Sequence, residues 1–126
     1  MNIPSDLLYS KEHEWAKIEG DIATIGITDF AQGSLGDITF VELPKVGAKV
    51  EQFANVGVIE SVKTVSDLYT PLGGEIVEVN SAIDADPAAL NNDPYGAGWL
   101  IKIKLAEPAQ TKALLDAAAY TGIAHD

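Results

Sequence analysis

Short β-type runs separated by turn sequences constrain the fold of this chain more than any other feature. Residues 99–105 alternate apolar side chains with Lys102 and Lys104, and this period of two is typical of a strand with one buried face. Similar runs, rich in β-branched residues, occupy 22–27, 37–43, 56–62 and 75–79. Sequences rich in Gly, Pro, Asn or Asp separate them at 19–21, 44–47, 71–74 and 91–94. Many short strands with regular breaks predict a mainly β fold, built as a sandwich or barrel.

Helix signals are fewer and mostly short. Thr28 and Asp29 can cap a helix that continues to about Leu35, and Asp86-Pro87 can begin another. The longest predicted helix lies at the C-terminus, from about 108 to 120, because a proline stands at its start and a glycine follows its end. We therefore expect a β core with short helices and a C-terminal helix.

The charge balance excludes several classes of partner. The 126 residues suit a single domain, 1–126, and contain 8 lysines and no arginine against 19 acidic residues, which gives a net charge of −11. Such a surface repels the phosphates of nucleic acids and anionic membranes, and no apolar run approaches the roughly 20 residues that span a bilayer. Basic patches on partner proteins are the surfaces that this chain can attract.

The residue inventory also leaves little material for an independent enzyme. Cysteine is absent and the only histidines are His13 and His125, which excludes disulfides and thiolate chemistry and argues against a histidine-rich metal site. A phosphate-binding glycine loop and a nucleophile elbow are both missing. The first residues have neither a basic segment nor an apolar core. We therefore expect a non-catalytic protein of the bacterial cytoplasm, with a mature mitochondrial matrix form left open.

One lysine stands in an unusual position. Lys63 follows the β-type run 56–62, and a second polar and β-type segment begins at Thr64. From spacing alone, a lone lysine in such a segment is most often a solvated side chain. The residues from Val62 to Val65 include no Gly, Asn or Pro, so propensity does not by itself place a tight hairpin turn there.

The segment nevertheless closely resembles the carrier-lysine hairpin of glycine cleavage H proteins. That resemblance rests on Glu60-Ser61-Val62-Lys63, then Ser66-Asp67, then 71–76 (Pro-Leu-Gly-Gly-Glu-Ile), so the expected carrier hairpin covers about 56–79. Further matches to the family follow in the expected order at 9–15, 26–32, 35–38, 41–44 and 91–100. The likeness extends over about residues 3–120, and six elements in the right order are far more specific than any one of them.

The resemblance implies a fold, a cofactor and a set of partners. It implies a lipoyl/biotinyl-type barrel-sandwich hybrid in which Lys63 holds lipoic acid in amide linkage. Such a carrier takes an aminomethyl group from a pyridoxal-phosphate glycine decarboxylase component to a folate-dependent aminomethyltransferase component. Dihydrolipoamide dehydrogenase then reoxidises the carrier, and a lipoylating enzyme installs the group. The cofactor supplies the reactive sulfurs, which explains how a chain without cysteine can take part in thiol chemistry. A carrier that serves several enzymes is expected to be a monomer.

In the family the arm docks in a surface groove, and three positions here match its polar lining. They are Glu14, Ser66 and Asp67, of which the two acids could otherwise be ordinary solvated side chains. A carboxylate there could form a charge-assisted hydrogen bond with an ammonium group. We expect His13 to be a surface or capping residue.

Other readings of Lys63 stay open at this point. A lipoyl domain of a 2-oxo acid dehydrogenase complex would have Asp-Lys-Ala around the lysine, and a biotin carrier would have Met on both sides. An H-like protein could also relay lipoyl groups to other enzymes. An unmodified interaction domain is the alternative from a different functional class.

Overall fold

The computed structural model describes residues 1–124, which form two antiparallel β-sheets. The larger sheet has the strand order β1-β2-β3-β9-β8-β5, and the smaller has the order β4-β6-β7. The strands are β1 (Leu8–Tyr9), β2 (Glu14–Glu19), β3 (Ile22–Ile27), β4 (Ile38–Glu42), β5 (Lys49–Val50), β6 (Asn55–Ser61), β7 (Val65–Tyr69), β8 (Gly74–Val79) and β9 (Ile101–Leu105). The expected mainly β barrel-sandwich architecture is confirmed.

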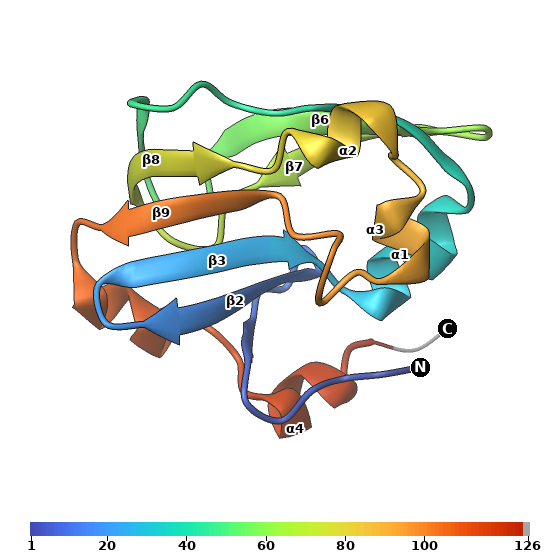
Figure 1. The fold of residues 1–126 in the computed structure, drawn as a ribbon. Coiled ribbons are helices and arrows are strands. Elements are labelled where there is room, and N and C mark those ends of the chain that lie inside the picture. The colour runs from blue at the N-terminus through green and yellow to red at the C-terminus, as the bar shows by residue number, and fades with distance from the viewer. Residues whose placement is uncertain (125–126) are drawn as a thin grey trace.

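The helices are short and lie at the margins of the sheets (Figure 1). They are α1 (Asp29–Leu35), α2 (Ala82–Ala85), α3 (Ala89–Asn92), the 3₁₀ helix η1 (Pro108–Ala113) and α4 (Ala117–Thr121). The hydroxyl of Thr28 accepts the Ala31 amide and caps α1, and Gly36, with φ of 77°, ends it. None of the helices within residues 1–124 is long and apolar enough to cross a membrane.

The prediction of one helix over 108–120 is wrong. The chain leaves the 3₁₀ helix at Leu114, and Leu115 exchanges two backbone hydrogen bonds with Tyr9, of 2.8 and 2.7 Å. Asp116 then caps the separate helix α4 by accepting the Ala119 amide. The extended backbone that pairs with Tyr9 cannot also be helical, so a tertiary contact overrides the local propensity.

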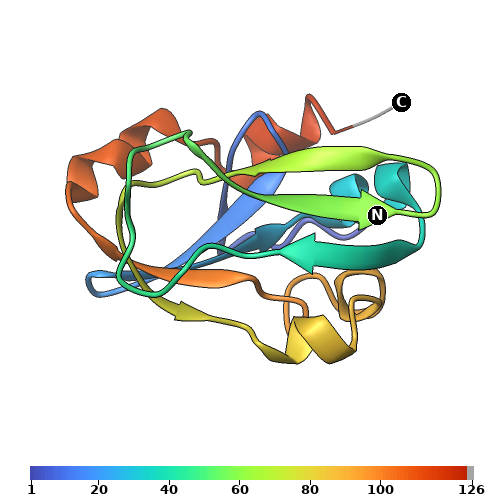
Figure 2. The same cartoon turned by 90° about the horizontal axis from the view of Figure 1, so that it is seen from above.

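The predicted carrier hairpin of 56–79 is too long. Only β6 and β7 form the hairpin, whereas residues 74–79 belong to β8 in the other sheet. In both views the turn between β6 and β7 projects at one end of the molecule (Figures 1 and 2). The hairpin is therefore a single β-ribbon that ends in a free turn.

Two apolar clusters hold these elements together. The larger one fills the space between the sheets with side chains from their strands and with Ile83 and Leu90 from α2 and α3. The second packs beneath α4 and contains Leu7, Tyr9, Trp15, Tyr120 and Ala124. The second cluster fastens the C-terminal segment to the start of the chain, which matters for the site below.

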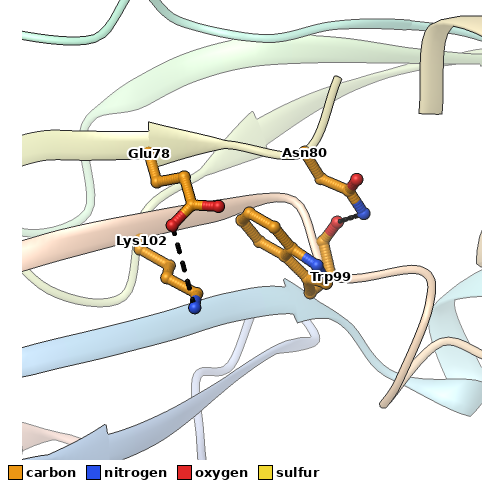
Figure 3. A network of polar contacts seen from close by, with 4 residues as sticks. All are labelled: Glu78, Asn80, Trp99 and Lys102. Carbon is orange, nitrogen blue, oxygen red and sulfur yellow. Dashed lines mark hydrogen bonds and ion pairs between the residues drawn. The ribbon is translucent and has the colours of Figure 1, made fainter. Parts of the chain in front are cut away.

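A polar network fixes the start of β9 against the end of β8 (Figure 3). Asn80 donates from Nδ2 to the carbonyl of Trp99 at 2.7 Å, and Lys102 Nζ lies 3.9 Å from a Glu78 carboxylate oxygen. The same ammonium lies 5.2 Å from the centre of the Trp99 ring, a cation–π arrangement. Trp99 is half-buried and precedes β9, so the strand begins two residues later than the run 99–105 predicted.

Candidate functional site

Lys63 lies in the turn of the β6–β7 hairpin. Its side chain is exposed, and so are those of Val62, Thr64 and Val65 around it. Within the described residues Lys63 forms no ion pair. An accessible amine without a salt-bridge partner fits an enzyme-catalysed acylation, so Lys63 is suited to hold an acyl group in amide linkage.

The hydroxyl of Ser61 organises this turn in place of the usual turn residues. Its Oγ accepts the amide of Thr64 at 3.2 Å and that of Lys63 at 3.4 Å, and the Ser61 amide donates to the Thr64 carbonyl at 2.8 Å. A serine that accepts backbone amides two or three residues later is a recognised turn motif. Residues 62–65 contain none of the usual turn residues Gly, Asn or Pro. The sequence feature that could have predicted the turn is Ser61, two positions before Lys63.

Gly36 borders the lysine stem. A Cβ atom at this position would lie 3.4 Å from Lys63 Cε, and the backbone φ of 77° independently favours glycine. The Val62 amide also donates to the carbonyl of the neighbouring Asp37 at 3.0 Å. The loop after α1 thus supports one side of the turn.

Removing the Ser61 hydroxyl should loosen the turn without unfolding the protein. We expect Ser61→Ala to lower the free energy of unfolding by about 1 kcal/mol, the usual size for the loss of a local side-chain cap. Acylation of Lys63 should also slow, because the lysine backbone samples more conformations. Ser61→Thr, which keeps the hydroxyl, is the matched control, and urea denaturation together with a timed modification assay checks both effects. Equal rates for the two variants would contradict this role.

All three predicted polar residues line one groove beside the hairpin. Glu14, Ser66 and Asp67 border a cavity of about 220 Å³ between β2, α1 and β7. Its apolar lining consists of Ile27, Phe30, Ala31, Leu35, Ile59 and Leu68. Ser66 stands three residues from Lys63, at most about 10 Å along the chain at about 3.3 Å per extended residue. An acyl chain on Lys63 that folds back along β7 would therefore come within reach of this groove.

Glu14 is buried and not a solvated acid. Its side chain is 3% exposed, and Ser10 Oγ donates to its carboxylate at 2.6 Å. Burial raises the pKa of Glu14 to about 8, with a further increase from the charge of Glu12, while the Ser10 hydroxyl and the Tyr69 amide partly offset the increase. Near neutral pH this carboxyl group is largely protonated, and a cation entering the groove would favour its ionisation.

Asp67 and Ser66 occupy different environments on β7. Asp67 is exposed at the rim and accepts a hydrogen bond from the Tyr69 hydroxyl at 3.3 Å, whereas Ser66 is half-buried. The nearby Asp67 charge raises the pKa of Tyr69. The groove thus combines one protonated buried acid with one exposed carboxylate.

His13 is half-buried, contrary to the expected surface or capping position. Its Nδ1 lies 2.8 Å from the Tyr120 hydroxyl, and its ring packs on Phe30 with 4.6 Å between centroids. Burial lowers the pKa of His13. Sequence reasoning missed Ser10, which contacts Glu14, and Tyr120, which contacts His13. Neither residue belongs to a sequence motif that predicts a place in this site.

No set of acidic or histidine side chains in residues 1–124 is arranged to hold a metal ion. The candidate site consists of the exposed amine of Lys63 and the mixed polar and apolar groove beside it.

A family model, curated relatives and a solved structure that match this chain all have the same description. A family model described as glycine cleavage H-protein matches residues 7–126. A glycine cleavage system H protein of Symbiobacterium thermophilum is 57% identical over 119 residues, covering 94% of this chain and 93% of its own. One from Opitutus terrae is 58% identical over 120 residues, with 94% of each chain covered. The crystal structure of a glycine cleavage system H protein from Mycobacterium marinum superposes with a TM-score of 0.85 at 45% identity, covering 95% of this chain and 97% of that one.

Proposed function

This chain belongs to the glycine cleavage H-protein family, and we propose that its Lys63 carries the lipoyl group with which such a carrier serves glycine cleavage. Membership makes the chain a carrier component and not a catalyst. The observation that carries the assignment to Lys63 is its place at the exposed turn of the β6–β7 hairpin, three residues from the groove. When bound, the lipoyl group supplies the sulfur chemistry that accepts an aminomethyl group.

The protein's own residues would present and shelter the arm. The turn held by Ser61 keeps Lys63 accessible to partner enzymes, and the apolar lining of the groove can cover the arm between visits. Glu14 and Asp67 can each form a charge-assisted hydrogen bond with a primary ammonium. Because an ammonium favours the ionised form of Glu14, a cationic arm end would displace the proton that this carboxyl group holds in the empty groove.

The partners follow from the same proposal. They are a pyridoxal-phosphate glycine decarboxylase component, a folate-dependent aminomethyltransferase component, dihydrolipoamide dehydrogenase and a lipoylating enzyme. The tether raises the effective concentration of the arm at each partner in turn, which suits a monomeric carrier with transient contacts. The relatives named above are bacterial, and the proposal places this carrier in the bacterial cytoplasm.

Mass spectrometry tests the proposal directly. The protein is produced in bacteria that lipoylate their own proteins, its intact mass is measured, and the peptide that contains Lys63 is sequenced. We expect a single lipoyl-sized increase confined to Lys63, with the exposed Lys11 and Lys112 unmodified. A biotin-sized increase would keep the carrier but overturn the pathway. An unmodified Lys63 in such cells would favour an interaction domain.

A further inference from the structure

The C-terminal helix α4 places a buried hydroxyl behind the wall of the groove, against the lining residue His13. Tyr120 is fully buried, and its Oη lies 2.8 Å from His13 Nδ1 and 2.6 Å from Thr28 Oγ1. Thr28 Oγ1 also accepts the Ala31 amide at 3.2 Å, the bond that caps α1. One phenol therefore joins α4, the turn before β2 and the start of α1.

One order of donors that this network allows leaves His13 neutral. The Ala31 amide can only donate, so the Thr28 hydroxyl can pass its own proton towards Tyr120, and Tyr120 can donate to His13. A nitrogen that accepts a hydrogen bond belongs to an uncharged imidazole, which then carries its proton on Nε2. The lowered pKa of His13 agrees with this arrangement.

The network also supports a strained residue. His13 has φ of 68°, a left-handed conformation that is uncommon for residues other than glycine. Its carbonyl accepts the Thr28 amide at 3.0 Å, and its ring packs on Phe30. His13 and Phe30 both line the groove that contains Glu14 and Asp67. The shape and charge of this wall thus depend on a helix that lies outside the sheets, beside the N-terminal segment (Figure 1).

We propose that Tyr120 is a positioning residue whose hydroxyl keeps His13 uncharged against Phe30, so that the groove accepts a cationic arm end. The inference rests on the function proposed above, in which Lys63 carries the arm. An imidazolium at this position would repel an ammonium and would compete with it for Glu14. The titratable groups that line the groove with His13 are Glu12 and Glu14 on its own segment and Asp67 across the groove, and of these the Glu12 charge raises the pKa of His13, while α1 presents the uncharged Phe30.

The test compares two hydroxyl deletions in one pair of stacked rings. Tyr120 stacks on Tyr9, with 4.6 Å between centroids and 9° between planes. Tyr120→Phe keeps the stack and removes the hydroxyl from His13. Tyr9→Phe, the matched control, removes a hydroxyl that donates to the Pro4 carbonyl and does not touch His13.

Two measurements are made on each variant. The first is an NMR titration of the His13 imidazole in the unmodified protein, in which Tyr120→Phe should raise the pKa of His13 while Tyr9→Phe leaves it unchanged. The second is the rate at which the loaded, lipoylated protein loses its aminomethyl group. At about pH 5.5, one unit below the ordinary histidine value of about 6.5, Tyr120→Phe should lose the group roughly fivefold faster than Tyr9→Phe, as expected for one like-charge contact in a hydrated groove.

A second substitution separates charge from loss of structure. His13→Asn tolerates the left-handed backbone and stays uncharged at every pH. Adding it to Tyr120→Phe should abolish the faster loss at low pH. An unchanged His13 pKa in Tyr120→Phe, or equally fast loss in the double variant, would overturn the inference. If Lys63 carries no lipoyl group, the proposed function fails as well; if Lys63 is lipoylated normally and Tyr120→Phe behaves like Tyr9→Phe, only the inference fails.

Discussion

Replacing Lys63 with arginine is expected to abolish lipoylation and with it all glycine cleavage that this chain supports. Acylation needs a nitrogen that can become a neutral nucleophile, and a guanidinium group stays protonated in proteins. The side chain is exposed and forms no ion pair within the described residues, so the substitution should change the free energy of unfolding by less than about 0.5 kcal/mol. The loss is therefore chemical and not structural.

Glycine turnover measured in cells that depend on this carrier checks the result, together with the intact mass of each variant. Lys112→Arg is the matched control, because Lys112 is also exposed but lies in η1, away from the hairpin. It should stay lipoylated on Lys63 and support normal turnover. Continued turnover with Lys63→Arg would show that the chain acts through some other residue.

Local sequence patterns predicted five of the nine strands in residues 1–124, because a strand's alternation of buried and exposed residues is a local property. The runs at 22–27, 37–43 and 56–62 correspond to β3, β4 and β6 within one residue at each end. The helix capped by Thr28 was predicted for the same reason, since its cap and its final glycine are close in sequence. The segment 108–120 was mispredicted because the contact that breaks it comes from Tyr9, at the other end of the chain.

The site was accessible to sequence reasoning only in part. Lys63, Glu14, Ser66 and Asp67 came from resemblance to a family, and the structure brings the last three to one groove. Tyr120 is separated from its partner His13 by 107 positions, so no spacing rule could pair them. Ser10 is only four residues from Glu14, but a hydrogen bond of that span in a tight turn has no sequence signature.

The buried carboxyl group of Glu14 should make the protein less stable as the pH rises. Its pKa is about 8 in the folded state against 4.5 as the ordinary value, so between these two pH values the folded protein holds a proton that the unfolded chain releases. The free energy of unfolding falls with rising pH wherever the folded state binds more protons than the unfolded state. The stabilising contribution is thus complete below about pH 4.5 and is lost as the pH rises through about 8. At about 1.4 kcal/mol for each pKa unit, the total is on the order of a few kcal/mol.

Glu14→Gln should remove this pH dependence, because the amide can still accept from Ser10 Oγ but cannot ionise. Urea denaturation at about pH 5 and about pH 9 measures it, and the free energy of unfolding of wild type should fall by about 4 kcal/mol more than that of the variant across that interval. Asp67→Asn makes the same chemical change at an exposed carboxylate of the same groove. Its free energy of unfolding should therefore change with pH as that of wild type does. Parallel curves for wild type and Glu14→Gln would mean that Glu14 is ionised in the folded protein. Glu14 would then add a negative charge to that of Asp67 in the empty groove near neutral pH, and a cationic arm end would enter it without displacing a proton.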